Sequence, residues 1–242
     1  MIKAIIFDLD GTLVQTEIVK AHSYAKAINQ LSSNEVSEEE VIESFRSNVG
    51  LARQEVASNL VKEFRSRLDP DAKSDNESLE DLVIETRLDI YNNMLEDPEI
   101  LPRYCCKMTM GFLYSVKADN YLTGLATMSH CMQVEKVLKI MNIKEKFKFV
   151  ITRDEIENAK PHPEIYLRMK NKLQVESDEC IVIEDSVAGI KAALSANMLV
   201  FAVTNSITKE SVLKSKLLDK KFIIENPAEL KTKVYDFIDL LK

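Results

Sequence analysis

Reactive side chains in this chain of 242 residues stand directly behind short apolar runs. Asp8 and Asp10 follow the first run, Thr127 follows another, and Glu184 and Asp185 follow a third. Apolar runs without alternation are typical of parallel strands that are buried on both faces. In such sheets, ligands bind beyond the carboxyl ends of the strands. We therefore expect these side chains to gather at one edge of a sheet, rather than in separate solvated turns.

Four carboxylates at one edge would repel one another unless a cation or shared protons compensated. A small set of oxygen ligands favours Mg²⁺, which takes carboxylates together with water and a substrate phosphate. Lys160 adds a positive charge and Thr127 adds a hydroxyl donor. With a carboxylate nucleophile, these groups predict phosphoryl transfer. The alternatives are that Thr127 caps a helix and that Lys160 is a solvated loop residue.

The hydrophobic pattern indicates which elements position these groups. Past Pro102, apolar runs alternate with segments of helical periodicity, which predicts βαβ units and a parallel sheet. The strands that we predict are residues 5–7, 121–126, 147–151, 180–183, 199–203 and 222–224. The helices that we predict between them are residues 103–117, a segment around 134–141, 164–173 and 187–196, and a closing helix follows at 227–241.

From about residue 16 to residue 94 the pattern is helical, without a convincing strand. Ser37 and Glu40 have the spacing of a capping box that begins a helix, and Gly50 breaks the helical pattern after it. The predicted fold class is therefore α/β, with a core formed by residues 1–15 and 96–242. An all-helical domain, residues 16–95, is inserted into this core.

The composition argues against several classes of partner. The formal net charge of −7 disfavours nucleic acid and anionic membranes, which both attract basic surfaces. No apolar stretch approaches the roughly 18 residues of a membrane span, and the first apolar run is too short for a signal peptide. The four cysteines lack the C-x-x-C spacing of zinc sites and redox pairs. We expect a cytoplasmic protein that acts on a small molecule.

The motifs resemble those of the haloacid dehalogenase superfamily of phosphotransferases, and most closely the branch of beta-phosphoglucomutase and related sugar-phosphate phosphatases. The similarity covers nearly the whole chain. It is strongest in DLDGT at residues 8–12, KPHPEIY at 160–166 and IVIEDSVAGIKAALSANM at 181–198. The resemblance implies a Rossmann-like three-layer core with a mobile helical cap.

The resemblance also implies roles for the reactive residues. Asp8 would attack phosphorus and form an aspartyl-phosphate, and Asp10 would act as the general acid and base. Mg²⁺ would be held by the Asp8 carboxylate, the Asp10 backbone carbonyl and Asp185, with Glu184 either a ligand or a partner of a ligand. Phosphoryl oxygens would be bound by Lys160 and Thr127. Ser129 is an alternative to Thr127 as the hydroxyl donor.

The inserted helices match the part of the family that selects the substrate. Gly50 and Arg53 correspond to the substrate-facing loop of the cap, with Arg46 as an alternative. Members that handle hexose phosphates have a His where this chain has Lys20, and an Asp where it has Gln15. We therefore expect a Mg²⁺-dependent phosphatase for a small phosphorylated metabolite, such as a sugar phosphate or a phosphoglycolate-like compound. The alternatives are a phosphosugar mutase and a non-catalytic binding protein.

Overall fold

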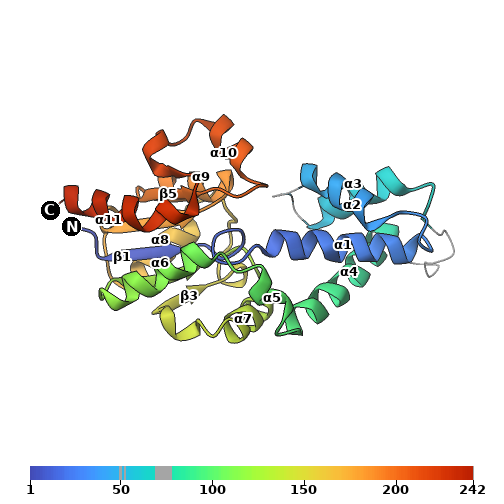
Figure 1. Cartoon of the computed structure of the whole chain (residues 1–242), viewed down its shortest axis with the longest axis horizontal. Helices are drawn as coiled ribbons and strands as arrows, with labels where there is room; N and C mark the ends of the chain where they lie inside the picture. The colour runs from blue at the N-terminus through green and yellow to red at the C-terminus, as the bar shows by residue number, and fades with distance from the viewer. Residues whose placement is uncertain (49–50, 52, 69–77, 242) are drawn as a thin grey trace. The chain divides into compact units, whose positions relative to one another are not determined.

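The computed structural model describes residues 1–48, 51, 53–68 and 78–241 (Figure 1). The chain forms two compact units, one of Met1–Gln15 with Leu101–Lys242 and one of Thr16–Ile100. We call the first the sheet unit and the second the helical unit. Gly50 lies outside the described residues.

The sheet unit contains six parallel strands among its described residues, in the order β3-β2-β1-β4-β5-β6. They are β1 Ala4–Phe7, β2 Leu122–Ala126, β3 Phe149–Ile151, β4 Cys180–Glu184, β5 Leu199–Val203 and β6 Ile223–Ile224. Phe7 lies opposite Leu125 and Ile183 in the two neighbouring strands. The three central strands therefore end at the same level, which aligns the residues that follow them.

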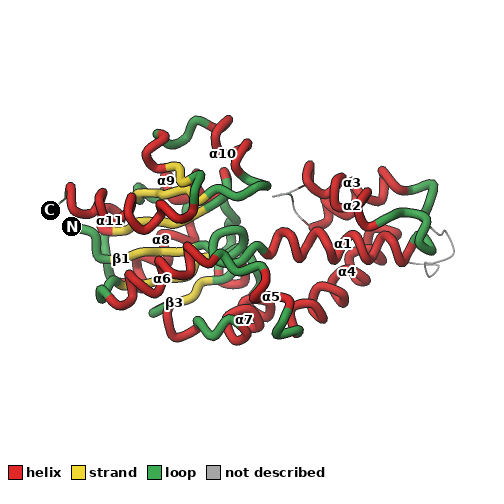
Figure 2. The backbone as a smooth tube through the Cα atoms, viewed as in Figure 1, coloured by secondary structure: helices red, strands yellow, loops and turns green. Residues whose placement is uncertain are grey.

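Helices cover both faces of this sheet (Figure 2). The longer helices of the sheet unit are α6 Lys107–Ala118, α7 Cys131–Ile140, α8 Glu164–Leu173, α9 Val187–Ser195, α10 Lys209–Ser215 and α11 Leu230–Leu240. A short helix, α5 Ile100–Arg103, begins at the last residue of the helical unit and continues into the sheet unit. Ile6 of β1 packs in one apolar cluster with Met169 of α8 and Ile190 of α9. The neighbouring Phe7 faces the other way, with its ring centroid 5.9 Å from that of Phe112 on α6. Both faces of β1 are thus buried, which explains its unbroken apolar run and confirms the predicted three-layer α/β fold.

Short 3-10 helices complete the described elements. They are η1 Arg46–Asn48, η3 Lys144–Lys146, η4 Arg153–Glu155, η5 Ser177–Glu179, η6 Lys220–Phe222 and η7 Pro227–Glu229. Of these, η1 belongs to the helical unit and the others to the sheet unit.

The helical unit contains α1 Thr16–Leu31, α2 Glu38–Phe45, α3 Arg53–Phe64 and α4 Leu79–Glu96. Its own apolar core includes Tyr24, Phe45, Leu60 and Val83. The predicted capping box begins α2: the Glu40 backbone N–H donates to Ser37 Oγ at 3.3 Å, and the Ser37 N–H donates to the Glu40 carboxylate at 2.9 Å.

Several predicted strands begin one or two residues too early, β3 for example at Phe149 rather than at residue 147, and two helices differ more from the prediction. Helix α10 was not predicted, because its seven residues bury only Val212 and give no clear periodicity. The predicted helix 103–117 is interrupted, since Cys105 pairs with Val14 in an isolated β-bridge and α6 begins only at Lys107.

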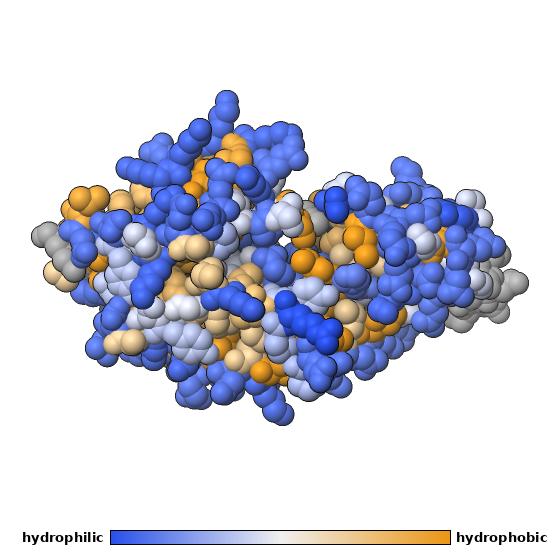
Figure 3. Space-filling model, in the orientation of Figure 1, coloured by the Kyte–Doolittle hydropathy of each residue, from blue (hydrophilic) through white to orange (hydrophobic). Residues whose placement is uncertain are grey.

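The surface has a mainly polar character on the face that Figure 3 displays. The exposed large apolar side chains of the sheet unit include Met108, Tyr114 and Met132. Among the described residues, no helix has the length and apolar character needed to cross a membrane.

Candidate active site

The first acidic residue of the site directly follows β1. The Asp8 backbone N–H donates to the Ile183 carbonyl oxygen at 3.0 Å, so the strand pairing continues to this residue. Asp8 is buried, with only 6% of its surface exposed. Gly11 turns the chain with a φ of +83°, and a Cβ atom there would lie 2.1 Å from Asp185 Oδ2. Because glycine has no side chain, the turn that follows β1 can approach Asp185, which follows β4.

Lys160 places its ammonium group between two of the carboxylates. Its Nζ atom donates at 2.7 Å to Asp8 Oδ1, at 2.7 Å to Glu184 Oε1 and at 3.1 Å to the Ala126 carbonyl oxygen. The Lys160 side chain is 4% exposed. Burial by itself lowers the pKa of Lys160, but the charges of Asp8 and Glu184 outweigh it and raise that pKa well above its usual value. Lys160 is thus a buried cation, and not a solvated loop residue.

Glu184 is surrounded by donors from the protein itself. Lys160 and the Tyr166 hydroxyl donate to Oε1, and the backbone N–H groups of Asp185 and Ser186 donate to Oε2, as does Ser186 Oγ. A Cβ atom on Gly189 would lie 1.7 Å from Oε1, so the glycine in α9 leaves room for this carboxylate. Burial raises the pKa of Glu184, but Lys160 and the other donors lower it below its usual value. Glu184 is therefore a buried carboxylate whose oxygens are occupied by donors.

The acidic residues are close enough to hold one metal ion. Asp8, Glu184 and Asp185 each have a carboxylate oxygen within 4.8 Å of one from the others, and all three residues are buried. Burial raises the pKa of Asp8 well above its usual value, Lys160 opposes this rise, and Glu184 and Asp10 add to it. Burial is thus the main factor that disfavours the ionised form of Asp8, and a bound cation would oppose it. A set of hard carboxylate oxygens in this arrangement fits Mg²⁺.

The Asp10 carboxylate accepts hydrogen bonds from two hydroxyl groups. Thr127 Oγ1 donates to Asp10 Oδ2 at 3.0 Å, and Ser129 Oγ donates to the same oxygen at 2.7 Å. Thr127 does not cap a helix, since α7 begins at Cys131 after His130. Both residues that sequence reasoning proposed as the hydroxyl donor thus orient the Asp10 carboxylate in this structure.

The other predicted residues lie in the helical unit. Lys20 on α1 forms an ion pair with Glu17 at 2.6 Å, and Arg46 forms one with Glu43 at 3.2 Å. Arg53 is the first residue of α3. Burial lowers the pKa of Arg53, and the positive charge of Arg87 lowers it further.

Arg87 on α4 is a residue that sequence reasoning missed. It is 5% exposed, and its Cζ atom lies 4.7 Å from the ring centroid of Tyr24 and 5.2 Å from that of Tyr91. Its Nε atom has no hydrogen-bond partner within the described part of the chain. Arg87 is therefore a buried cation that contacts two aromatic rings.

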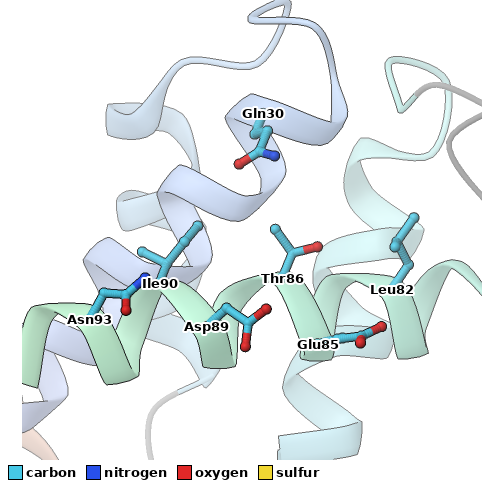
Figure 4. Close-up of a pocket in the computed structure, with 7 residues that line it drawn as sticks. All are labelled: Gln30, Leu82, Glu85, Thr86, Asp89, Ile90 and Asn93. Atoms are coloured by element: carbon cyan, nitrogen blue, oxygen red, sulfur yellow. The ribbon is translucent and has the colours of Figure 1, made fainter.

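A recess of about 360 Å³ also lies in the helical unit, between α1 and α4 (Figure 4). It is lined by Gln30, Leu82, Glu85, Thr86, Asp89, Ile90 and Asn93. Glu85 and Asp89 give this recess a negative charge, which disfavours a phosphate. It contains none of the residues that the sequence singled out.

Comparison of the sequence with models of known protein families gives a match between residues 5–203 and the family of haloacid dehalogenase-like hydrolases. A phosphorylated carbohydrates phosphatase of Thermotoga maritima is 24% identical over 242 residues, which cover 99% of this chain and 98% of that protein. The chloroplastic protein SUPPRESSOR OF QUENCHING 1 of Arabidopsis thaliana is 27% identical over 214 residues, which cover 88% of this chain but only 19% of that protein.

The chain is also similar to solved structures. The crystal structure of a beta-phosphoglucomutase from Clostridium difficile has a TM-score of 0.68 and 26% identity, and the match covers 99% of this chain and 100% of that one. The predicted resemblance and the expectation of an enzyme of the hydrolase class are confirmed: the chain belongs to the haloacid dehalogenase-like hydrolases.

Proposed function

We propose that this protein is a Mg²⁺-dependent phosphatase that hydrolyses a small phosphorylated metabolite through an aspartyl-phosphate on Asp8. The observation that carries the proposal is the environment of this carboxylate. Asp8 is buried at the end of a central strand, accepts a hydrogen bond from Lys160 at 2.7 Å, and lies beside Asp185. The similarity to a phosphorylated carbohydrates phosphatase supports the same reaction and suggests the substrate class.

The proposed metal ligands are the Asp8 and Asp185 carboxylates, joined by the Asp10 backbone carbonyl that the family pattern implies. When bound, Mg²⁺ would offset the negative charge of the carboxylates and stabilise charge on the phosphoryl oxygens. Because the Glu184 oxygens already accept from protein donors, we assign Glu184 to orienting Lys160 rather than to binding the metal directly. Lys160 would then hold the Asp8 carboxylate and attract the phosphoryl group.

In the proposed mechanism, Asp10 protonates the leaving oxygen and then accepts a proton from the attacking water. Two hydroxyl donors on Oδ2, from Thr127 and Ser129, favour Oδ1 as the atom that carries the proton. The same hydrogen bonds fix the direction in which the carboxyl group points. A role of Thr127 in binding phosphoryl oxygens stays a prediction, because its hydroxyl group donates to Asp10 here.

We further propose that the helical unit acts as a cap and binds a second anionic group of the substrate. Lys20 is paired with Glu17 at 2.6 Å, which makes it a weaker candidate than the sequence suggested. Arg53 and Arg87 are the better candidates, because the positive charge of Arg87 acts on Arg53 and because Arg87 Nε has no hydrogen-bond partner within the described residues. A cytoplasmic location, which the four free cysteines support, belongs to the same proposal.

A phosphosugar mutase is the second candidate, because a beta-phosphoglucomutase is among the similar structures. A mutase must keep water away from the aspartyl-phosphate until the bisphosphate intermediate has changed its orientation in the site. Gln15 and Lys20 replace the Asp and His of the mutase-like pattern, and Gln15 Nε2 donates to the Gly11 carbonyl oxygen at 3.1 Å. We therefore favour net hydrolysis.

A phosphate-release assay over sugar phosphates, phosphoglycolate and nucleoside monophosphates tests this proposal. We expect release that requires Mg²⁺ and stops in excess chelator. A parallel assay follows glucose 6-phosphate formation from beta-glucose 1-phosphate with a bisphosphate primer. Rapid isomerisation with little free phosphate would make the protein a mutase, and full hydrolysis in chelator would reject the metal assignment.

A further inference from the structure

Asn205, in the loop after β5, contacts two parts of the acidic site that follow other strands. Its Nδ2 atom donates to Asp185 Oδ2 at 2.9 Å and to the Gly11 carbonyl oxygen at 3.4 Å. Gly11 belongs to the loop after β1, and Asp185 directly follows β4. One amide group therefore connects the loops behind three strands of the sheet.

The orientation of this amide is fixed by its own loop. Asn205 Oδ1 accepts from the backbone N–H of Ile207 at 2.9 Å and from that of Thr208 at 3.0 Å. If the amide were turned over, its NH₂ group would face these two donors. The Nδ2 atom must therefore point toward Asp185.

The Asp185 carboxylate also lies close to the Gly11 backbone. Asp185 is buried, and its Oδ2 atom occupies space that a side chain at position 11 would need, since a Cβ atom there would lie 2.1 Å away. A hydrogen bond to an ionised acceptor is strong enough to select one side-chain rotamer. A neutral amide does this without reducing the negative charge that a cation needs, whereas a lysine at this position would compete with the cation.

We propose that Asn205 is a positioning residue that fixes the Asp185 carboxylate for cation binding. The inference rests on the proposed function only in taking Mg²⁺ as the cation. Without the amide, Asp185 would have to lose rotational freedom when it binds Mg²⁺, and the affinity would fall. Groups that orient metal ligands typically change metal affinity by 10–100-fold when they are removed.

Asn205→Ser separates this role from the role of Asn205 in its own turn. A serine oxygen can still accept a backbone N–H in such a turn, but the shorter side chain does not reach Asp185. Calorimetric titration of the whole chain with Mg²⁺ should give a Kd about tenfold higher than that of the wild type. The Mg²⁺ concentration that half-saturates phosphate release should rise by a similar factor, with a smaller change in kcat at saturating Mg²⁺.

Asn226→Ser is the matched control. Asn226 Oδ1 accepts from the Ala228 backbone N–H at 3.2 Å in a similar turn, which follows β6. This variant should bind Mg²⁺ as the wild type does. If Asn205→Ser does not fold, Asn205→Ala takes its place in the titration with the same expected result.

Equal Mg²⁺ affinities in the wild type and the Asn205 variant would overturn the inference, as would a wild type that binds no Mg²⁺ in this titration. A wild type that binds Mg²⁺ more tightly than the Asn205 variant supports it. If that wild type releases no phosphate from any substrate, the proposed function fails while the inference about Asn205 stands.

Discussion

Replacing Lys160 with methionine measures how strongly the buried ammonium group stabilises the acidic site. Its Nζ atom lies 2.7 Å from Asp8 Oδ1 and 2.7 Å from Glu184 Oε1, with the side chain 4% exposed. Methionine has a similar length and no charge, so Lys160→Met leaves both carboxylates without their cation and preserves much of the packing. Removing one partner from a buried ion pair costs about 3–5 kcal/mol, because a buried charge remains uncompensated.

We expect Lys160→Met to lower the free energy of unfolding by this amount, about 3–5 kcal/mol, in urea titrations with excess chelator. At about 2–4 °C per kcal/mol, the thermal midpoint should fall by roughly 6–20 °C. Lys172→Met is the matched control, since Lys172 pairs with Glu155 at 2.8 Å where both side chains are at least 40% exposed. Such a surface pair contributes only about 0–1 kcal/mol.

The difference between Lys160→Met and the wild type should shrink as the pH falls. Although burial raises the pKa of Glu184, Lys160 and the other donors keep it below its usual value in the wild type. That stabilisation is present above the unfolded pKa and is lost as the pH falls through the lower folded pKa. In the variant the carboxylate takes up a proton at a higher pH, which removes the uncompensated charge. Equal stabilities of Lys160→Met and Lys172→Met at pH 7 would refute this reasoning.

Two further predictions concern other carboxylates. Glu164→Gln should lower the thermal midpoint at pH 7, because backbone N–H groups, aided by Arg168, lower the pKa of Glu164 from 4.5 to about 2. The difference from the wild type should vanish as the pH falls from about 5 toward 2, and its persistence at pH 2 would contradict the assignment. Thr127→Val with Ser129→Ala removes both hydroxyl donors from Asp10 Oδ2 and should lower kcat about 10–100-fold, as expected for lost hydrogen bonds to a charged group. A double variant with wild-type kcat and pH profile would show that Asp10 needs neither hydroxyl group.

Local patterns in the sequence predicted the elements that bury many apolar side chains. The predicted strand 5–7 lies within β1, which begins one residue earlier, at Ala4. The predicted helix 164–173 coincides with α8. The capping box at Ser37 was predictable because both of its hydrogen bonds join residues three positions apart. Helix α10 was not, since a short helix with one buried residue has almost no apolar periodicity.

The partners that orient the reactive residues could not be predicted from the sequence alone. Tyr166 stood in a quoted motif, yet its hydrogen bond to Glu184 depends on how α8 packs against the sheet. Asn205 and Asp185 are 20 positions apart and meet only because β5 lies beside β4. The buried position of Arg87 between two tyrosines likewise follows from helix packing. The motifs thus indicated which residues could react, whereas the partners that orient them required the structure.

Detection of a phosphorylated Asp8 is the most direct test of the central proposal. The wild type would be mixed with its substrate and Mg²⁺, quenched with borohydride, which reduces an aspartyl-phosphate to homoserine, and analysed by peptide mass spectrometry. We predict homoserine at position 8 in the wild type, and loss of nearly all phosphate release in a folded Asp8→Asn variant, since an amide cannot form the acyl phosphate. Substantial turnover by Asp8→Asn, or modification of a different residue, would contradict the proposed mechanism.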